Sequence, residues 1–247
     1  MDYLLIGNGP SINNIDWGQV QDTTLCKVGI NRSYIVFPSH DYLFFQDPII
    51  VQELLDAGYT EPDLFNLNLR TTNYFNTRLL RDRAKGMVTA YEFQELAGFI
   101  RSNAVNIVRK FAFHTYAPFT IPNAISYFSH LDQRDFQKPN SSKHYKNTIP
   151  ITFYIAGCDL KFSQNNNHFW QHKYENQSRL SGAGGSSRKQ LNKQYGAFQR
   201  VAVRADFLKI NIVSVTPKSK LNNLFKYEPI TTVLNRYRKR KNNDRKY

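Results

Sequence analysis

The stretch YLLIGNGPS, residues 3–11, decides the fold of this chain. Its first four residues are apolar and predict a buried strand, and the turn from Gly7 to Ser11 follows directly. A strand that runs into Gly-x-Gly is typical of nucleotide-binding α/β folds, because the glycines let backbone N–H groups face a phosphate. Ile12 stands where the dinucleotide fingerprint has its third glycine, so the turn argues against a dehydrogenase.

The alternation of short strand, loop and helix continues along the chain. Apolar runs predict further strands at 26–30, 41–45, 149–156 and 210–215, with a weaker alternation at 64–69. Helical apolar spacing marks residues 49–55, 91–113 and 190–208, and the last ordered piece is expected at 221–234. The sequence therefore predicts an α/β protein with a Rossmann-like parallel sheet and flanking helices.

Three segments depart from this alternation. Pro118 and Pro122 predict a break in the chain before residues 124–128, and the polar residues 132–148 predict an exposed insert. Residues 163–187 are rich in Asn, Ser and Gly, which is typical of a flexible lid or loop.

Charge is the most unusual feature of the composition. The chain has 247 residues, and 33 Lys and Arg against 19 Asp and Glu give it a net charge of +14. Such a charge favours polyanions or anionic substrates as partners. The charge is densest in residues 236–247, a basic tail that either only keeps the protein soluble or contacts nucleic acid or an anionic membrane.

Other features point to a cytoplasmic location. No apolar run reaches the roughly 18 residues of a membrane span, and the N-terminus does not have the pattern of a signal peptide. Cys26 and Cys158 lie in apolar segments and predict reduced core thiols. No Cys/His cluster has zinc-ligand spacing, so we expect no metal.

Polar clusters follow the first three predicted strands. They are Gly7–Ser11, Asn31–Arg32 and Gln46–Asp47. Ligands of parallel sheets bind beyond the carboxyl ends of the strands. The sequence therefore predicts one binding site at this edge.

The string LLIGNGPSI, residues 4–12, resembles the opening of the bacterial sialyltransferases that decorate lipooligosaccharide with CMP-sialic acid. Further matches follow in chain order: Asn31, residues 44–48, residues 121–123, residues 155–159 and residues 209–221. The resemblance implies a nucleotide-sugar glycosyltransferase that inverts, needs no metal or other cofactor, and forms a homo-oligomer. It places a nucleotide-sugar-binding domain in residues 1–162 and 188–235, with 163–187 as lid.

The resemblance also implies a set of donor-binding residues at the strand ends. They are Gly7, Asn8, Gly9, Pro10, Ser11, Asn31, Arg32, Asn123, Gly157 and Asp159. Asp159 either holds ribose hydroxyls or braces the glycine turn, and Ser11 either bonds a phosphate or caps a helix.

The catalytic half departs from the family's pattern. The family's catalytic histidine falls near Asn192, where this chain has no histidine. An inverting transfer still needs a group that takes the acceptor proton, and the candidates are Asp47, His168 and His172. Basic residues are expected to contact the acceptor or the leaving phosphate: Lys161, Arg179, Arg188 and Lys189.

The acceptor stays open between two classes. The net charge favours a hydroxymethylated base in viral DNA by a small margin, whereas the resemblance favours a lipooligosaccharide or another glycan. A non-enzymatic nucleotide- or nucleic-acid-binding protein is the third alternative.

Overall fold

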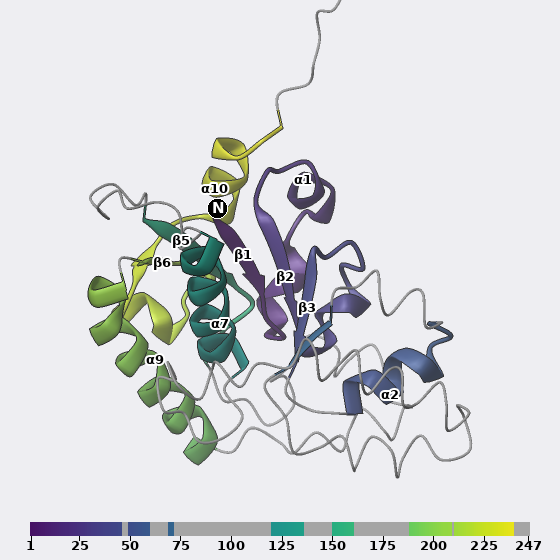
Figure 1. Cartoon of the computed structure of the whole chain (residues 1–247), viewed down its shortest axis with the longest axis horizontal. Helices are drawn as coiled ribbons and strands as arrows, with labels where there is room; N and C mark the ends of the chain where they lie inside the picture. The colour runs from purple at the N-terminus through teal and green to yellow at the C-terminus, as the bar shows by residue number, and fades with distance from the viewer. Residues whose placement is uncertain are drawn as a thin grey trace, which may run out of the picture.

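A computed structural model describes residues 1–45, 49–59, 69–71, 120–135, 150–160, 188–208 and 210–239. In these residues the chain forms a seven-stranded sheet of order β4-β3-β2-β1-β5-β6-β7, and every pairing is parallel (Figure 1). The strands are β1 (Tyr3–Ile6), β2 (Cys26–Ile30), β3 (Tyr42–Phe45), β4 (Leu69–Thr71), β5 (Ile151–Ala156), β6 (Ile210–Ser214) and β7 (Lys226–Tyr227). The predicted Rossmann-like α/β class is confirmed.

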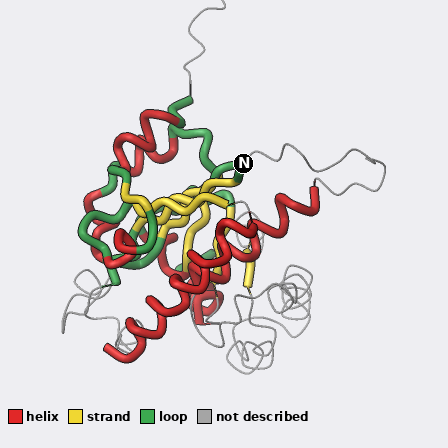
Figure 2. Tube along the Cα trace, turned by 90° about the vertical axis from the view of Figure 1, so that its left-hand side faces the viewer, coloured by secondary structure: helices red, strands yellow, loops and turns green. Residues whose placement is uncertain are grey.

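Helices cover both faces of the sheet (Figure 2). The α-helices are α1 (Trp17–Gln21), α2 (Ile49–Asp56), α7 (Thr120–Asp135), α9 (Arg188–Leu208) and α10 (Ile230–Arg236). Short 3-10 helices are η1 (Pro10–Asn14), η2 (Asn31–Ile35) and η4 (Lys220–Asn223). Because side chains alternate along a strand, Tyr3 and Leu5 join the core beneath α7 and α9, and Leu4 and Ile6 join the core beneath α1 and α10.

Helix α7 differs from the sequence prediction. It begins at Thr120 and passes through Pro122, where a break was expected, and it ends at Asp135 inside the predicted insert. Pro122 is the third residue of the helix, in the first turn, where a backbone N–H has no helical acceptor to lose. Within the described residues, no helix combines the length and the apolarity needed to cross a membrane.

Several predicted segments lie outside the described residues. They are residues 91–113, most of 64–69, residues 136–148 of the insert, and the lid at 163–187. The division into one binding domain and a lid therefore stays a prediction.

The chain order creates a switch point at the centre of the sheet. After β1, the chain adds β2, β3 and β4 on one side, and then returns to place β5 on the other side of β1. The residues that follow β1 and β5 meet there, because Ile6 pairs with Ala156 at the end of both strands. Ligands of open parallel sheets bind at such a point.

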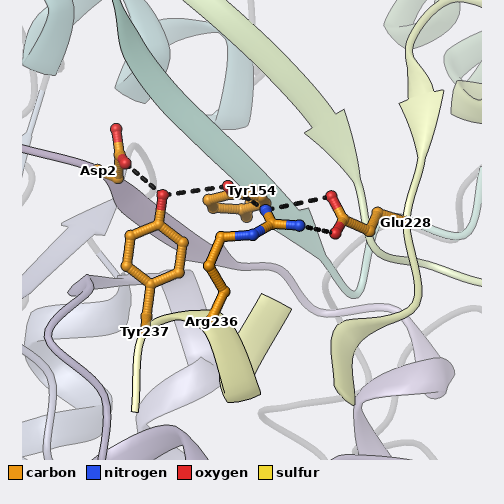
Figure 3. A network of polar contacts seen from close by, with 5 residues as sticks. All are labelled: Asp2, Tyr154, Glu228, Arg236 and Tyr237. Atoms are coloured by element: carbon orange, nitrogen blue, oxygen red, sulfur yellow. Dashed lines mark hydrogen bonds and ion pairs between the residues drawn. The ribbon is translucent and has the colours of Figure 1, made fainter. Parts of the chain in front are cut away.

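The opposite, amino-terminal edge of the sheet holds both ends of the described chain. Asp2 accepts hydrogen bonds from the Thr152 amide (2.8 Å) and from the Tyr237 hydroxyl. The Tyr237 hydroxyl also lies 3.2 Å from that of Tyr154, to which Arg236 donates (3.1 Å) (Figure 3). Desolvation, followed by the bond to Asp2, raises the pKa of Tyr237. The network ties α10 to β1 and β5.

The first residues of the predicted basic tail contact other parts of the described chain. Arg236 forms an ion pair with Glu228, and Lys239 donates its amide to Asp22 O at 2.7 Å. Thr23 and Arg238 form an antiparallel bridge. These contacts hold residues 236–239 against the loop before β2.

Candidate functional site

The glycine turn after β1 binds to the neighbouring strand. The Gly7 amide donates to Ala156 O (2.8 Å), and the Gly9 amide donates to Gly157 O (2.7 Å). A Cβ on Gly9 would lie 1.9 Å from Asp159 Oδ2 and 2.7 Å from Gly157 O. The expectation that these two amides face a phosphate is therefore wrong, because the glycines let two backbone turns approach each other instead.

Asp159 braces this turn from the β5 side. Its Oδ2 accepts from the Ser11 hydroxyl (2.9 Å) and from the Ser11 amide (3.3 Å). Pro10 begins η1 directly before Ser11, and a proline fits the first position of a helix. A carboxylate at this place repels a phosphate, so the turn is better suited to hydroxyl or amine groups.

Gly157 completes the contact between the two turns. Its φ is +66°, and a Cβ there would lie 2.2 Å from Ile12 Cγ2. Both constraints require glycine at this position. Gly157 thus shapes the switch point through its backbone.

Asn8 and Asn31 present unused amide oxygens at the carboxyl edge. The Oδ1 atoms of both are buried and have no hydrogen-bond partner among the described residues. The two asparagines follow the paired residues Ile6 and Gly29 by two positions each, so they lie at neighbouring strand ends. Buried polar atoms are nearly always satisfied, and these two are among five exceptions in the described residues. A ligand that donates hydrogen bonds at the ends of β1 and β2 would satisfy both.

The first turn of α7 lies beside Asn31. The Asn31 Nδ2 atom donates to Thr120 Oγ1 at 3.3 Å, and Thr120 is the first residue of the helix. Asn123, a predicted donor contact, lies in the same turn and is only 2% exposed. A helix N-terminus carries partial positive charge, so this end of the site suits an anion.

Arg32 does not face the predicted site. Its guanidinium is buried against Glu53 of α2, with Nε–Oε2 at 2.8 Å and Nη2–Oε1 at 2.5 Å. The prediction that Arg32 contacts the donor is corrected, because both arms of this fork bind a carboxylate of the protein itself.

His40 packs under the Asn31 turn. Its Nε2 lies 3.2 Å from Ser33 Oγ, and its Nδ1 has no partner among the described residues. Burial lowers the pKa of His40 to about 3. Gly29 makes room for the ring, since a Cβ there would lie 2.2 Å from Nε2.

The remaining predicted residues are not placed by the described part of the chain. Asp47, His168, His172, Lys161 and Arg179 lie outside it, and the side chains of Arg188 and Lys189 at the start of α9 are not described. Within the described ranges, no three His, Cys, Asp or Glu residues gather as metal ligands would. Neither Cys26 nor Cys158 forms a disulfide, and burial raises the pKa of the Cys158 thiol.

Sequence reasoning missed Thr120, Glu53 and His40. Thr120 and Glu53 meet their partners across 89 and 21 residues, so no local motif marks them. His40 left a weak signal, a histidine just before a strand.

Solved structures share this fold. No protein-family model matches the sequence, and none of the curated proteins matches it significantly. A variant of the sialyltransferase CST-II in complex with CMP is 16% identical over 92% of this chain and 86% of that chain, with a TM-score of 0.50. CstII from Campylobacter jejuni with cytidine-5'-monophosphate is 15% identical over 92% of this chain and 85% of that chain, with a TM-score of 0.49. At 16% identity, the likeness to the CST-II variant shows the fold alone.

Proposed function

We propose that the protein is a glycosyltransferase that binds a nucleotide-sugar at the switch point between β1 and β5. The observation that carries this is the pair of unsatisfied, buried Oδ1 atoms of Asn8 and Asn31 at neighbouring strand ends. The fold, shared with a sialyltransferase bound to CMP, and the resemblance of residues 4–12 support the same ligand class.

In this proposal, the phosphate of the donor does not bind the backbone amides of the glycine turn. The amides of Gly7 and Gly9 are bound to β5, and Asp159 places a carboxylate at the turn. We assign the nucleoside, with the N–H donors of its base and the hydroxyls of its ribose, to Asn8 and Asn31. The phosphate fits the first turn of α7, where the helix dipole favours negative charge. A CMP- or UDP-sugar meets both requirements.

Transfer requires a base for the acceptor hydroxyl. Asp47, His168 and His172 stay the candidates, and we propose an inverting, metal-independent reaction on the strength of the family resemblance. Lys161, Arg179, Arg188 and Lys189 are the candidate contacts for the leaving phosphate or the acceptor.

The acceptor we propose is a glycan hydroxyl. The resemblance of residues 4–12 and the fold shared with a sialyltransferase support this class, and the basic segment that begins with Arg236, Arg238 and Lys239 lies at the opposite edge of the sheet. The small margin for DNA rested on net charge alone, and Lys218 and Lys220, which follow β6 at the carboxyl edge, suit an anionic glycan equally well.

Calorimetric titration with CMP and UMP tests the donor site directly. We expect Asn8→Ala and Asn31→Ala each to weaken binding at least about tenfold, the loss of one buried hydrogen bond to a ligand. Asn13→Ala is the matched control, an exposed asparagine near the same turn whose loss leaves affinity unchanged. Unchanged affinity in both site variants would contradict the assigned site.

The reaction is tested with the same protein. Hydrolysis of CMP- and UDP-sugars is measured first, and then transfer to a lactoside and to hydroxymethylated DNA. Transfer to the lactoside is the expected result. Transfer to DNA alone would reverse the acceptor assignment. If the protein neither binds nor turns over any nucleotide-sugar, the proposed enzymatic function is wrong.

A further inference from the structure

The residue next to Asn31 is locked in a buried ion pair. The Arg32 and Glu53 side chains are 8% and 9% exposed, and their two hydrogen bonds form a fork between η2 and α2. A buried pair of this kind adds little to stability, since well-packed apolar side chains of similar volume often serve as well. What the pair does supply is orientation, because a planar guanidinium fixes direction as well as distance.

The turn that the pair holds has an uncommon backbone conformation. Asn31 has a φ of +50°, in the left-handed region that glycine favours and that asparagine adopts more readily than most other residues. Three separate contacts enforce it here: Asn31 to Thr120 of α7, Arg32 to Glu53 of α2, and Ser33 to His40. Each of three consecutive side chains is thus tied to a different part of the fold.

From these contacts we infer that Arg32 and Glu53 are positioning residues, which aim the Asn31 amide at the donor without contacting the donor themselves. The inference rests on the proposed function, because it needs Asn31 to bind the nucleotide. The pair acts through the backbone of η2: when Arg32 is released, Asn31 can leave its left-handed conformation, and its amide then loses its direction.

The test must separate aiming from folding. In the double variant Arg32→Met with Glu53→Leu, apolar groups of similar length replace the pair, so the fold should persist. In Arg32→Lys the charge stays but the bidentate fork is lost. Tyr237→Phe is the control, because it loosens the network at the opposite edge of the sheet. Each variant receives a thermal melt and a calorimetric titration with CMP alone.

We expect the double variant to melt within about 5 °C of the wild type and to bind CMP at least about tenfold more weakly. Arg32→Lys should show a smaller loss in the same direction, and Tyr237→Phe should melt earlier with unchanged CMP affinity. Wild-type affinity in both folded pair variants overturns the inference and leaves the proposed function standing. The inference is also overturned if CMP affinity falls in proportion to the melting temperature in all three variants, or if the double variant does not fold. A wild type that binds neither CMP nor UMP removes the proposed function and this inference together.

Discussion

Acid should destabilise the protein through His40, because the imidazole is buried in the folded state and burial favours its neutral form. Its pKa falls from 6.5 to about 3 in the folded state, and the cause is burial. The folded state therefore binds fewer protons than the unfolded chain at any pH between these two values. Stability contributed by the neutral ring is complete above pH 6.5, is lost as the pH falls, and reaches its lower limit near pH 3.

The magnitude follows from linkage. Each pH unit in this window costs about 1.4 kcal/mol of unfolding free energy, so lowering the pH from 6.5 to 5 costs about 2 kcal/mol. The structure agrees with this cause, because a protonated ring carries an N–H on both nitrogens and Nδ1 has no hydrogen-bond partner among the described residues. The left-handed turn at Asn31 is tied to this ring through Ser33.

Urea unfolding at a series of pH values measures the effect, with His40→Gln as the comparison. The variant is expected to be less stable at every pH, but its free energy of unfolding should fall less steeply between pH 6.5 and 4, because the titrating group is gone. The difference between the two slopes removes the contribution of carboxylates common to both proteins. Parallel curves, or an imidazole that titrates near pH 6.5 by NMR in the folded protein, would refute the reasoning.

Other substitutions test separate contacts. Gly9→Ala should cost about 2–4 kcal/mol of unfolding free energy, because a Cβ 1.9 Å from Asp159 Oδ2 forces the two turns apart; urea unfolding measures this, and a cost under about 1 kcal/mol would show that the turns separate easily. Tyr237→Phe should cost about 1–2 kcal/mol by removing the hydroxyl that donates to Asp2, and the double variant with Asp2→Asn should cost less than the sum of the singles. Additive losses would show that the two side chains are not coupled. For the proposed donor site, Asn8→Ala and Asn31→Ala are the variants whose CMP affinity decides the outcome.

The sheet was largely predictable because its central strands are buried on both faces. Such strands appear in sequence as runs made mostly of apolar residues, and those at 3–6, 26–30, 151–156 and 210–214 do so. The two-residue strand β7 has exposed residues and leaves no such signal. The predicted start of helix α7 was wrong, because proline breaks the interior of a helix but is tolerated in the first turn, where Pro122 lies.

The gathering of the candidate residues at one edge was predictable, whereas their hydrogen-bond partners were not. Polar residues after β1, β2 and β5 do gather at one edge, as parallel strands require. The hydrogen-bond partners of those residues come from distant segments: Gly157 for Gly9, Glu53 for Arg32, Thr120 for Asn31. The local motif therefore predicted that two backbone amides and a guanidinium bind a ligand. In the structure, these groups form their hydrogen bonds with the protein itself.

The pairing of β1 with β5 has a consequence for how the chain is made. Tyr3 lies opposite Phe153, so the central ladder closes only after some 150 residues have been synthesised. Non-local pairing of this kind is slow, and until β5 emerges from the ribosome the wholly apolar β1 has one edge unprotected. Nascent chains shorter than this should depend on chaperones, whereas chains that include β5 should not.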